Sequence, residues 1–229
     1  EAVDRGVEAL DEFHGQVTGA FSGDEHLAGR SPVRGTELCA VVEYLYSLRY
    51  LLSVDGDPAY ADRLERLAFN ALPATLAPDA SAHQYDQQVN QVVCDVADRG
   101  WTNDPDATLF GIAPHYGCCT ANLHQGWPKV ATGMAMATDD GLAALVHGPY
   151  EATVDVGGDD GDGERVTVRS RTAYPFADEV TFAFELDGPV AFPFGVRVPS
   201  WAVEPTVATP DGEERVEPGT VHVVERAFA

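Results

Sequence analysis

The chain is organised around the stretch His115-Tyr116-Gly117-Cys118-Cys119-Thr120-Ala121-Asn122. Two adjacent cysteines can form a disulfide with each other only under strain, so Cys118 and Cys119 need another partner. Glu37 and Cys39 lie two residues apart and offer one carboxylate and one thiolate. These four side chains make a ligand set that zinc accepts, although their spacing is not that of a zinc finger or ribbon.

Two roles for such a site follow from the residues alone. A zinc ion with four protein ligands is closed, and closed sites are usually structural. A cation-bound thiol is deprotonated near neutral pH, however, so one of the coordinated cysteines could itself be a nucleophile. The fourth cysteine, Cys94, is interpreted as a core thiol, with a disulfide to Cys39 as the alternative.

Composition excludes several classes of partner. The 229 residues suffice for one large or two modest domains, and the net charge is −23, with thirteen Arg and a single Lys. So acidic a surface repels nucleic acid and anionic membranes, and it favours adaptation to high salt. Four cysteines make no disulfide framework, which favours reduced thiols and a cytoplasmic location. No apolar run reaches the roughly 20 residues of a membrane helix. Because Glu1 rather than Met comes first, we expect a piece of a longer protein.

The first part of the chain has helical patterns separated by loops. Apolar residues recur at helical spacing over 2–17, and a second apolar helix is predicted over 37–52, with Thr36 as its N-cap and Glu37 in its first turn. Pro58 opens another helix that runs to about Leu72. A further helix is predicted from Cys118 through Met136. Helices joined by short turns indicate a helical-hairpin array or toroid.

The second part of the chain is rich in short β-type runs. Most of them alternate apolar with polar residues and are bounded by Gly, Pro and Asp, which predicts an antiparallel β-sandwich. The runs are 142–146, 152–156, 165–169, 180–184, 190–198 and 221–224.

Two loops hold polar groups suited to chemistry. The loop 18–32 carries Asp24, Glu25 and His26 at its centre, either as catalytic groups or as a solvated acidic loop. The segment 85–91 combines a phenol with a run of amides, which suits hydrogen bonding to sugar hydroxyls but could equally tie the loop down.

Several of these motifs, taken in order along the chain, resemble glycoside hydrolase family 127, the β-L-arabinofuranosidase-type family. The resemblance covers essentially the whole chain, and the ordered set of motifs is more specific than any one of them. In the first part it rests on Phe21-Ser22-Gly23-Asp24-Glu25, Gly35-Thr36-Glu37-Leu38-Cys39, Tyr85 with the amides that follow, and Cys118-Cys119-Thr120-Ala121-Asn122. In the second part it rests on Leu142 to Pro149, Tyr174-Pro175-Phe176 and Arg197-Val198-Pro199-Ser200-Trp201.

The resemblance implies a mixed α+β, multidomain protein, in which part of an (α/α) helical barrel is followed by an antiparallel β-sandwich. We expect residues 1–140 to be the C-terminal part of the barrel's catalytic domain and residues 141–229 to be the sandwich. The resemblance also implies zinc held by one Glu and three Cys, and a retaining glycosidase with a cysteine nucleophile. By analogy the zinc ligands are Glu37, Cys39, Cys118 and Cys119, and Cys118 is the nucleophile.

The remaining site residues follow from the same resemblance. Glu25 lies nearest the family's general acid/base position, and Asp24 is the alternative because the loop before Glu37 is shorter here. Tyr85 resembles a substrate-contacting tyrosine, and His115 sits where it could reach the same pocket. An upstream half of the barrel, from which family members draw substrate-binding histidines, is absent from this chain.

Three functional hypotheses follow. The first is a zinc-thiolate glycosidase acting on β-linked furanosides such as β-L-arabinofuranosides. The second is a non-catalytic carbohydrate-binding or scaffold protein with a structural zinc site. The third treats the thiols as a redox or metal-storage device. The expected partner is a carbohydrate, with no nucleic acid and no membrane, and the β-sandwich offers a surface for a homodimer.

Overall fold

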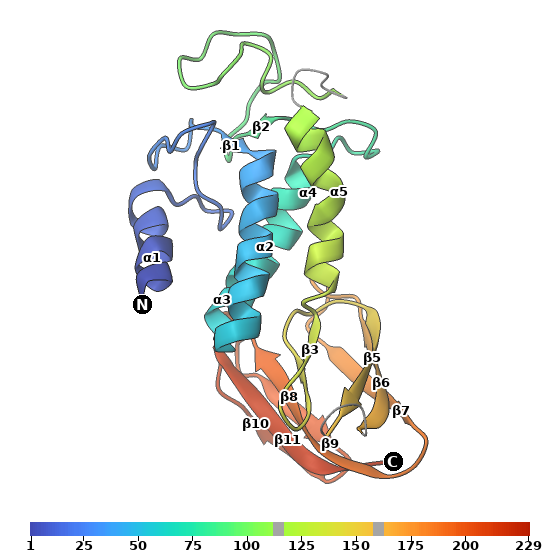
Figure 1. The fold of residues 1–229 in the computed structure, drawn as a ribbon. Helices are drawn as coiled ribbons and strands as arrows, with labels where there is room; N and C mark the ends of the chain where they lie inside the picture. Colours follow the sequence, from blue (N-terminus) through green and yellow to red (C-terminus); the bar gives the residue numbers. More distant parts are fainter. Residues whose placement is uncertain (112–116, 158–162) are drawn as a thin grey trace. The chain divides into compact units, whose positions relative to one another are not determined.

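The computed structural model describes residues 1–111, 117–157 and 163–229. The chain divides into two compact units. The helical unit comprises Glu1–Leu48 and Arg66–Lys129, and the strand-rich unit comprises Arg49–Glu65 and Val130–Ala229. The mixed α+β class expected from the sequence is therefore confirmed, whereas the (α/α) barrel stays a prediction (Figure 1). Within the described ranges, no helix combines the length and apolar character needed to cross a bilayer.

The helices largely follow the sequence patterns. They are α1 (Ala2–His14), α2 (Leu38–Asp55), α3 (Pro58–Arg66), the π-helix η1 (Leu67–Ala71), α4 (Leu72–Ala74) and α5 (Gly117–Ala131). Pro58 opens α3 as predicted, and the side chain of Asp57 accepts a hydrogen bond from the backbone N–H of Ala59 at 2.9 Å. That contact satisfies one of the N–H groups that a helix start leaves unpaired.

Several predicted helix boundaries are wrong, and the helix expected over 2–17 already ends at His14. Thr36 is not an N-cap, because Thr36–Glu37 form strand β1 and the Thr36 hydroxyl donates to the carbonyl of Phe21 at 3.1 Å. Helix α2 therefore begins only at Leu38. Helix α5 ends at Ala131 rather than Met136, because Ala135–Ala137 form strand β3 and pair with β4.

In the helical unit, helices α2 and α5 lie side by side and run in the same direction. Cys39, near the start of α2, contacts Cys119, near the start of α5. Further along, Lys129 of α5 lies 3.9 Å from Glu43 and 3.9 Å from the ring centre of Tyr46, both on α2. Because the two helices are parallel and are in contact near their starts, their N-termini lie next to each other.

Strand β1 fixes the entry to α2. It pairs antiparallel with β2 (Asp86–Gln87), and the backbone N–H of Glu37 donates to the carbonyl of Gly23 at 2.9 Å. The backbone N–H of Leu38 donates to the carbonyl of Tyr85 at 2.9 Å. The loop at Gly23, strand β1 and strand β2 are thus held next to one another.

The strand-rich unit contains a four-stranded sheet, a three-stranded sheet and a two-stranded hairpin. The order is β11-β8-β4-β3 in the first, β5-β6-β7 in the second, and β10-β9 in the hairpin. One pairing differs from the antiparallel expectation, since β4 runs parallel to β8. The strands of these sheets after β3 are β4 (Leu142–Ala144), β5 (Tyr150–Val156), β6 (Glu164–Thr172), β7 (Val180–Leu186), β8 (Val190–Val198), β9 (Thr206–Thr209), β10 (Gly212–Arg215) and β11 (Thr220–Phe228).

The two larger sheets share one apolar core, as in a β-sandwich. The buried cluster takes residues from β4 and β8 of one sheet and from β5 and β6 of the other. Phe184 of β7 packs edge-on against Phe194 of β8, with ring centres 4.9 Å apart. Strand β3, which precedes residue 141, also belongs to the four-stranded sheet.

A buried ion network ties α3 to strand β8 within the strand-rich unit. The side chain of Arg197 is fully buried and forms ion pairs with Asp62 and Glu65 of α3. Glu65 also accepts the backbone N–H of His147 at 2.9 Å and the hydroxyl of Tyr174. The positive charge of Arg197 is compensated within the network, which is the condition for keeping an arginine inside a core.

Arg197→Met is expected to lower the free energy of unfolding by about 3–5 kcal/mol, because it leaves the buried carboxylate of Glu65 and the partly buried one of Asp62 without their cation. The measurement is denaturant unfolding of the variant and the wild type. The matched control is Arg215→Met, which breaks the exposed pair with Glu204, each side chain 70% exposed, and should change stability by less than about 0.5 kcal/mol. Equal effects of the two variants would contradict the account.

Candidate active site

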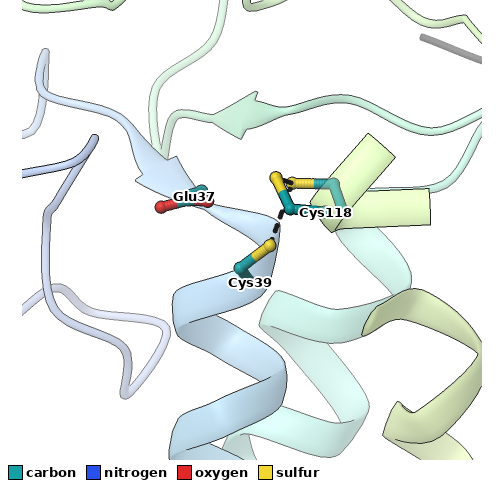
Figure 2. Close-up of side chains that lie close together, drawn as sticks. Glu37, Cys39 and Cys118 are labelled. Atoms are coloured by element: carbon teal, nitrogen blue, oxygen red, sulfur yellow. Dashed lines mark hydrogen bonds between the residues drawn. The ribbon is translucent and has the colours of Figure 1, made fainter. Parts of the chain in front are cut away.

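The four predicted metal ligands come together in the structure. One ligand atom from each lies within 4.8 Å of the others. The sulfur of Cys39 lies 3.4 Å from that of Cys119, which in turn lies 4.0 Å from the sulfur of Cys118. Figure 2 shows Glu37, Cys39 and Cys118 close together, on β1, at the start of α2 and on α5. Residues eighty positions apart in sequence thus form one cluster.

The cluster fits a zinc ion in its donor chemistry and spacing. Zinc–sulfur bonds of about 2.3 Å in a tetrahedron separate two sulfurs by roughly 3.8 Å, which falls between the two sulfur distances in the cluster. Three sulfurs and one carboxylate oxygen are ligand types that zinc binds. The three sulfurs differ in exposure, because Cys119 is buried, Cys39 is half-buried and Cys118 is exposed.

The position of the cluster favours negative charge on sulfur. Cys39 is the second residue of α2, and Cys118 and Cys119 are the second and third residues of α5. Helix N-termini carry partial positive charge, which stabilises thiolates. Hydrogen bonds from the thiol of Cys119 and the amide of Asn122 lower the pKa of Cys39 to about 6, although burial opposes them.

The other three ligands hold their protons more tightly. Burial, and next to it the charge of Cys39, raises the pKa of the Glu37 carboxyl to about 8. The pKa of Cys119 is raised by its hydrogen bond to Cys39 and by burial, and the pKa of Cys118 is raised by burial and by Cys39. Without a cation, the crowded cluster therefore keeps one thiolate at neutral pH and stores protons on its remaining members.

Zinc uptake is consequently expected to release protons. At pH 7 Cys39 is already ionised, so about three protons, from Glu37, Cys118 and Cys119, must leave as the ion binds. Zinc affinity should rise with pH, since fewer protons remain to be displaced. Calorimetric titration of the metal-free protein in two buffers of different ionisation enthalpy measures the number. Uptake of zinc without proton release would contradict this picture.

The loop before β1 carries both candidate acid/base residues. Their carboxyls differ in exposure and in hydrogen-bond partners. Asp24 is 1% exposed, and its carboxylate accepts the backbone N–H of Asn103. Glu25 is exposed and accepts the hydroxyl of Tyr85 at 3.2 Å. The backbone of Glu25 adopts a φ of 58°, a conformation that costs energy for a residue other than glycine. Of the two carboxyls, only that of Glu25 is open to a substrate.

Asp86 explains why Asp24 can stay buried. Asp86 is fully buried and lies within hydrogen-bonding range of Asp24. Burial, followed by the charge of Asp24, raises the pKa of Asp86 to about 10, so Asp86 is neutral at pH 7. A protonated Asp86 carboxyl can donate to the Asp24 carboxyl, so the two groups need not repel each other. The turn that presents Glu25 is anchored by this pair.

The amide-rich segment has mainly anchoring contacts. Tyr85 is 2% exposed and Gln87 is 6% exposed, and the Gln87 side chain donates to the carbonyl of Ala71 at 2.7 Å. Asn103, which the sequence patterns do not single out, donates from its side chain to the Tyr85 hydroxyl at 3.5 Å. His115 lies outside the described residues. Both interpretations of Cys94 are wrong, because its thiol is exposed rather than part of a core, and Cys39 and Cys94 are both free and form no disulfide.

Two family models match the chain. The first, described as β-L-arabinofuranosidase, GH127 catalytic domain, matches residues 8–132. The second, described as β-L-arabinofuranosidase, GH127 middle domain, matches residues 147–226. Together they cover both units of the fold.

Individual proteins are also similar to this chain, each at 25% identity or less. The non-reducing end β-L-arabinofuranosidase of Bifidobacterium longum subsp. longum is 25% identical over 199 residues, which is 83% of this chain and 29% of that protein. A GH127 β-L-arabinofuranosidase of Geobacillus stearothermophilus T6 has a TM-score of 0.75 at 16% identity, over 96% of this chain and 35% of that one. A structure titled glycoside hydrolase reaches 0.79 at 16% identity, over 97% and 40%. The chain thus spans less than half of each of these relatives.

Proposed function

Since the chain belongs to glycoside hydrolase family 127, we propose that it carries the zinc-thiolate centre of a retaining glycosidase that hydrolyses β-linked furanosides such as β-L-arabinofuranosides. The observation that carries the proposal is the convergence of Glu37, Cys39, Cys118 and Cys119 within 4.8 Å. The substrate class rests on the family and on the names of the relatives. We also propose that residues 1–140 contribute to an (α/α) barrel, with the β-sandwich over 141–229.

Zinc, when bound, keeps the sulfur of Cys118 deprotonated at neutral pH. Cys118 is the nucleophile in our proposal because it is exposed, whereas Cys119 is buried. The buried sulfur of Cys119 can bind an ion but is not accessible to a sugar. The exposed sulfur beside it can reach an anomeric carbon.

The reaction follows the two steps of retaining enzymes. In the first step Glu25 donates its proton to the glycosidic oxygen, the bond between that oxygen and the anomeric carbon breaks, and Cys118 Sγ bonds to the carbon. The leaving group departs as an alcohol. In the second step the Glu25 carboxylate takes a proton from water, the water oxygen bonds to the anomeric carbon, and the Cys118 thiolate leaves.

Contacts around Glu25 support its assignment over Asp24. The carboxyl of Glu25 is exposed and held by the hydroxyl of Tyr85, so it can meet a substrate in a fixed orientation. Asp24 is buried and committed to Asn103 and Asp86. Tyr85, whose hydroxyl holds Glu25, and His115 complete the proposed site.

The test is hydrolysis of an aryl β-L-arabinofuranoside by the intact protein before and after removal of zinc by a chelator. We expect turnover to disappear with the zinc and to return when one equivalent is restored. The stereochemistry of the first-formed product, followed by NMR, should be retained. Full activity in the zinc-free protein, or an inverted product, would refute the proposal. A protein that holds zinc but hydrolyses no furanoside would instead support a structural zinc site in a carbohydrate-binding protein.

A further inference from the structure

His83 lies outside the proposed reaction, yet it reaches the helix that carries two of the ligands. Its ring nitrogen Nε2 lies 2.9 Å from the hydroxyl of Thr120, the residue directly after Cys119. The other ring nitrogen, Nδ1, lies 3.1 Å from the carbonyl of Gln84. A carbonyl can only accept, so this contact assigns the hydrogen to Nδ1 and leaves Nε2 to accept from the Thr120 hydroxyl.

The backbone around His83 is held rigidly on two sides. His83 and Gly111 exchange two backbone hydrogen bonds, of 3.1 and 3.0 Å. The N–H of Gln84 donates to the carbonyl of Thr75 at 2.8 Å, and the Gln84 side chain donates to the carbonyl of Thr108 at 2.6 Å. His83 itself is 4% exposed. The imidazole therefore projects from a fixed platform and has little freedom to follow Thr120 if helix α5 turns.

The orientation of α5 about its own axis decides what each cysteine does. Successive residues of an α-helix point about 100° apart. Cys119 must face Cys39, 3.4 Å away, while Cys118 keeps its sulfur exposed. The first turn of a helix lacks part of its internal hydrogen bonding, so its position depends on outside contacts. Thr120 is in that turn, directly after Cys119 and two residues after Cys118.

We propose that the hydrogen bond between His83 and Thr120 fixes the rotation of the first turn of α5, and so holds Cys119 toward Cys39 and Cys118 toward the substrate. His83 and Thr120 are then positioning residues that act through the zinc ligands. This inference rests on the proposed zinc site. The contact should make the wild-type protein lose zinc more slowly than variants without it, and it should keep Cys118 aligned with Glu25.

The experiment measures zinc release to an excess of chelator in the intact protein, beside the unfolding midpoint. Thr120→Val removes the hydroxyl at nearly constant shape, and Thr120→Ser keeps it. We expect about tenfold faster zinc release from Thr120→Val and from His83→Leu, and a wild-type rate from Thr120→Ser. Because both single changes break the same contact, the double variant His83→Leu/Thr120→Val should release zinc no faster than either one alone.

The outcomes separate this inference from the function on which it rests. A wild-type protein that holds zinc, together with a Thr120→Val variant that releases it equally slowly, overturns the positioning role alone. Multiplicative rates in the double variant overturn it as well, since they would show independent effects. A lowered unfolding midpoint with unchanged zinc release would assign the contact to stability only. A wild-type protein that takes up no zinc overturns both proposals.

Discussion

Cys118→Ser is expected to lower kcat by about 10³-fold or more while the protein still retains zinc. A serine hydroxyl is not deprotonated at neutral pH as a metal-bound thiol is, so the variant lacks its nucleophile. Glu37, Cys39 and Cys119 remain, and three protein ligands suffice to hold zinc in many catalytic sites. Steady-state kinetics and metal analysis of the same preparation measure the two effects.

Two other cysteine variants show whether the effect is specific to Cys118. Cys119→Ser replaces the buried sulfur 3.4 Å from Cys39, and we expect it to lose zinc as well as activity. Cys94→Ser replaces an exposed thiol that is hydrogen-bonded by the amides of Gln84 and Gln91, outside the cluster, and kcat should stay within about twofold. Undiminished turnover by Cys118→Ser would exclude Cys118 as the nucleophile.

Glu25→Gln should lower kcat by about 10²–10⁴-fold, the contribution typical of a positioned general acid/base. The amide keeps the size of the side chain and can still accept from Tyr85, but it has no proton to exchange at neutral pH. Azide, a nucleophile that needs no general base, should partly restore turnover of an aryl furanoside whose leaving group needs no protonation. Kinetics with and without azide test this.

The matched control for this change is Asp24→Asn. The new amide oxygen can accept the backbone N–H of Asn103 as the carboxylate does, and the amide can donate to Asp86. We therefore expect kcat to fall by less than about tenfold. The opposite ranking, with Asp24→Asn severely impaired and Glu25→Gln active, would transfer the acid/base role to Asp24.

The make-up of the cluster could be predicted from the sequence because it depends on residue types. Adjacent cysteines pair with each other only under strain, so Cys118 and Cys119 need another partner. Glu37 and Cys39 offer the side chains that complete a zinc ligand set, and the sequence therefore predicts the cluster. In the structure the four ligand atoms lie within 4.8 Å of one another, while the metal and the catalytic roles stay predictions. The order of helices followed by strands likewise follows from local periodicity.

Features that depend on contacts distant in sequence could not be predicted. Thr36 has the chemistry of an N-cap, yet pairing of β1 with Asp86–Gln87 keeps the chain extended through Glu37. Ala135–Ala137 suit a helix by composition, but pairing with β4 makes them a strand. The contacts of Asn103 with Asp24 and of His83 with Thr120 join residues 79 and 37 positions apart, and no local pattern marks them.

Zinc K-edge X-ray absorption of the intact, zinc-loaded protein tests most directly whether these four side chains bind one ion. We expect three sulfur neighbours at about 2.3 Å and one oxygen at about 2.0–2.2 Å, with one sulfur lost in Cys118→Ser, the variant that keeps its zinc. A shell made only of nitrogen and oxygen, or a sulfur count that Cys118→Ser leaves unchanged, would contradict this arrangement.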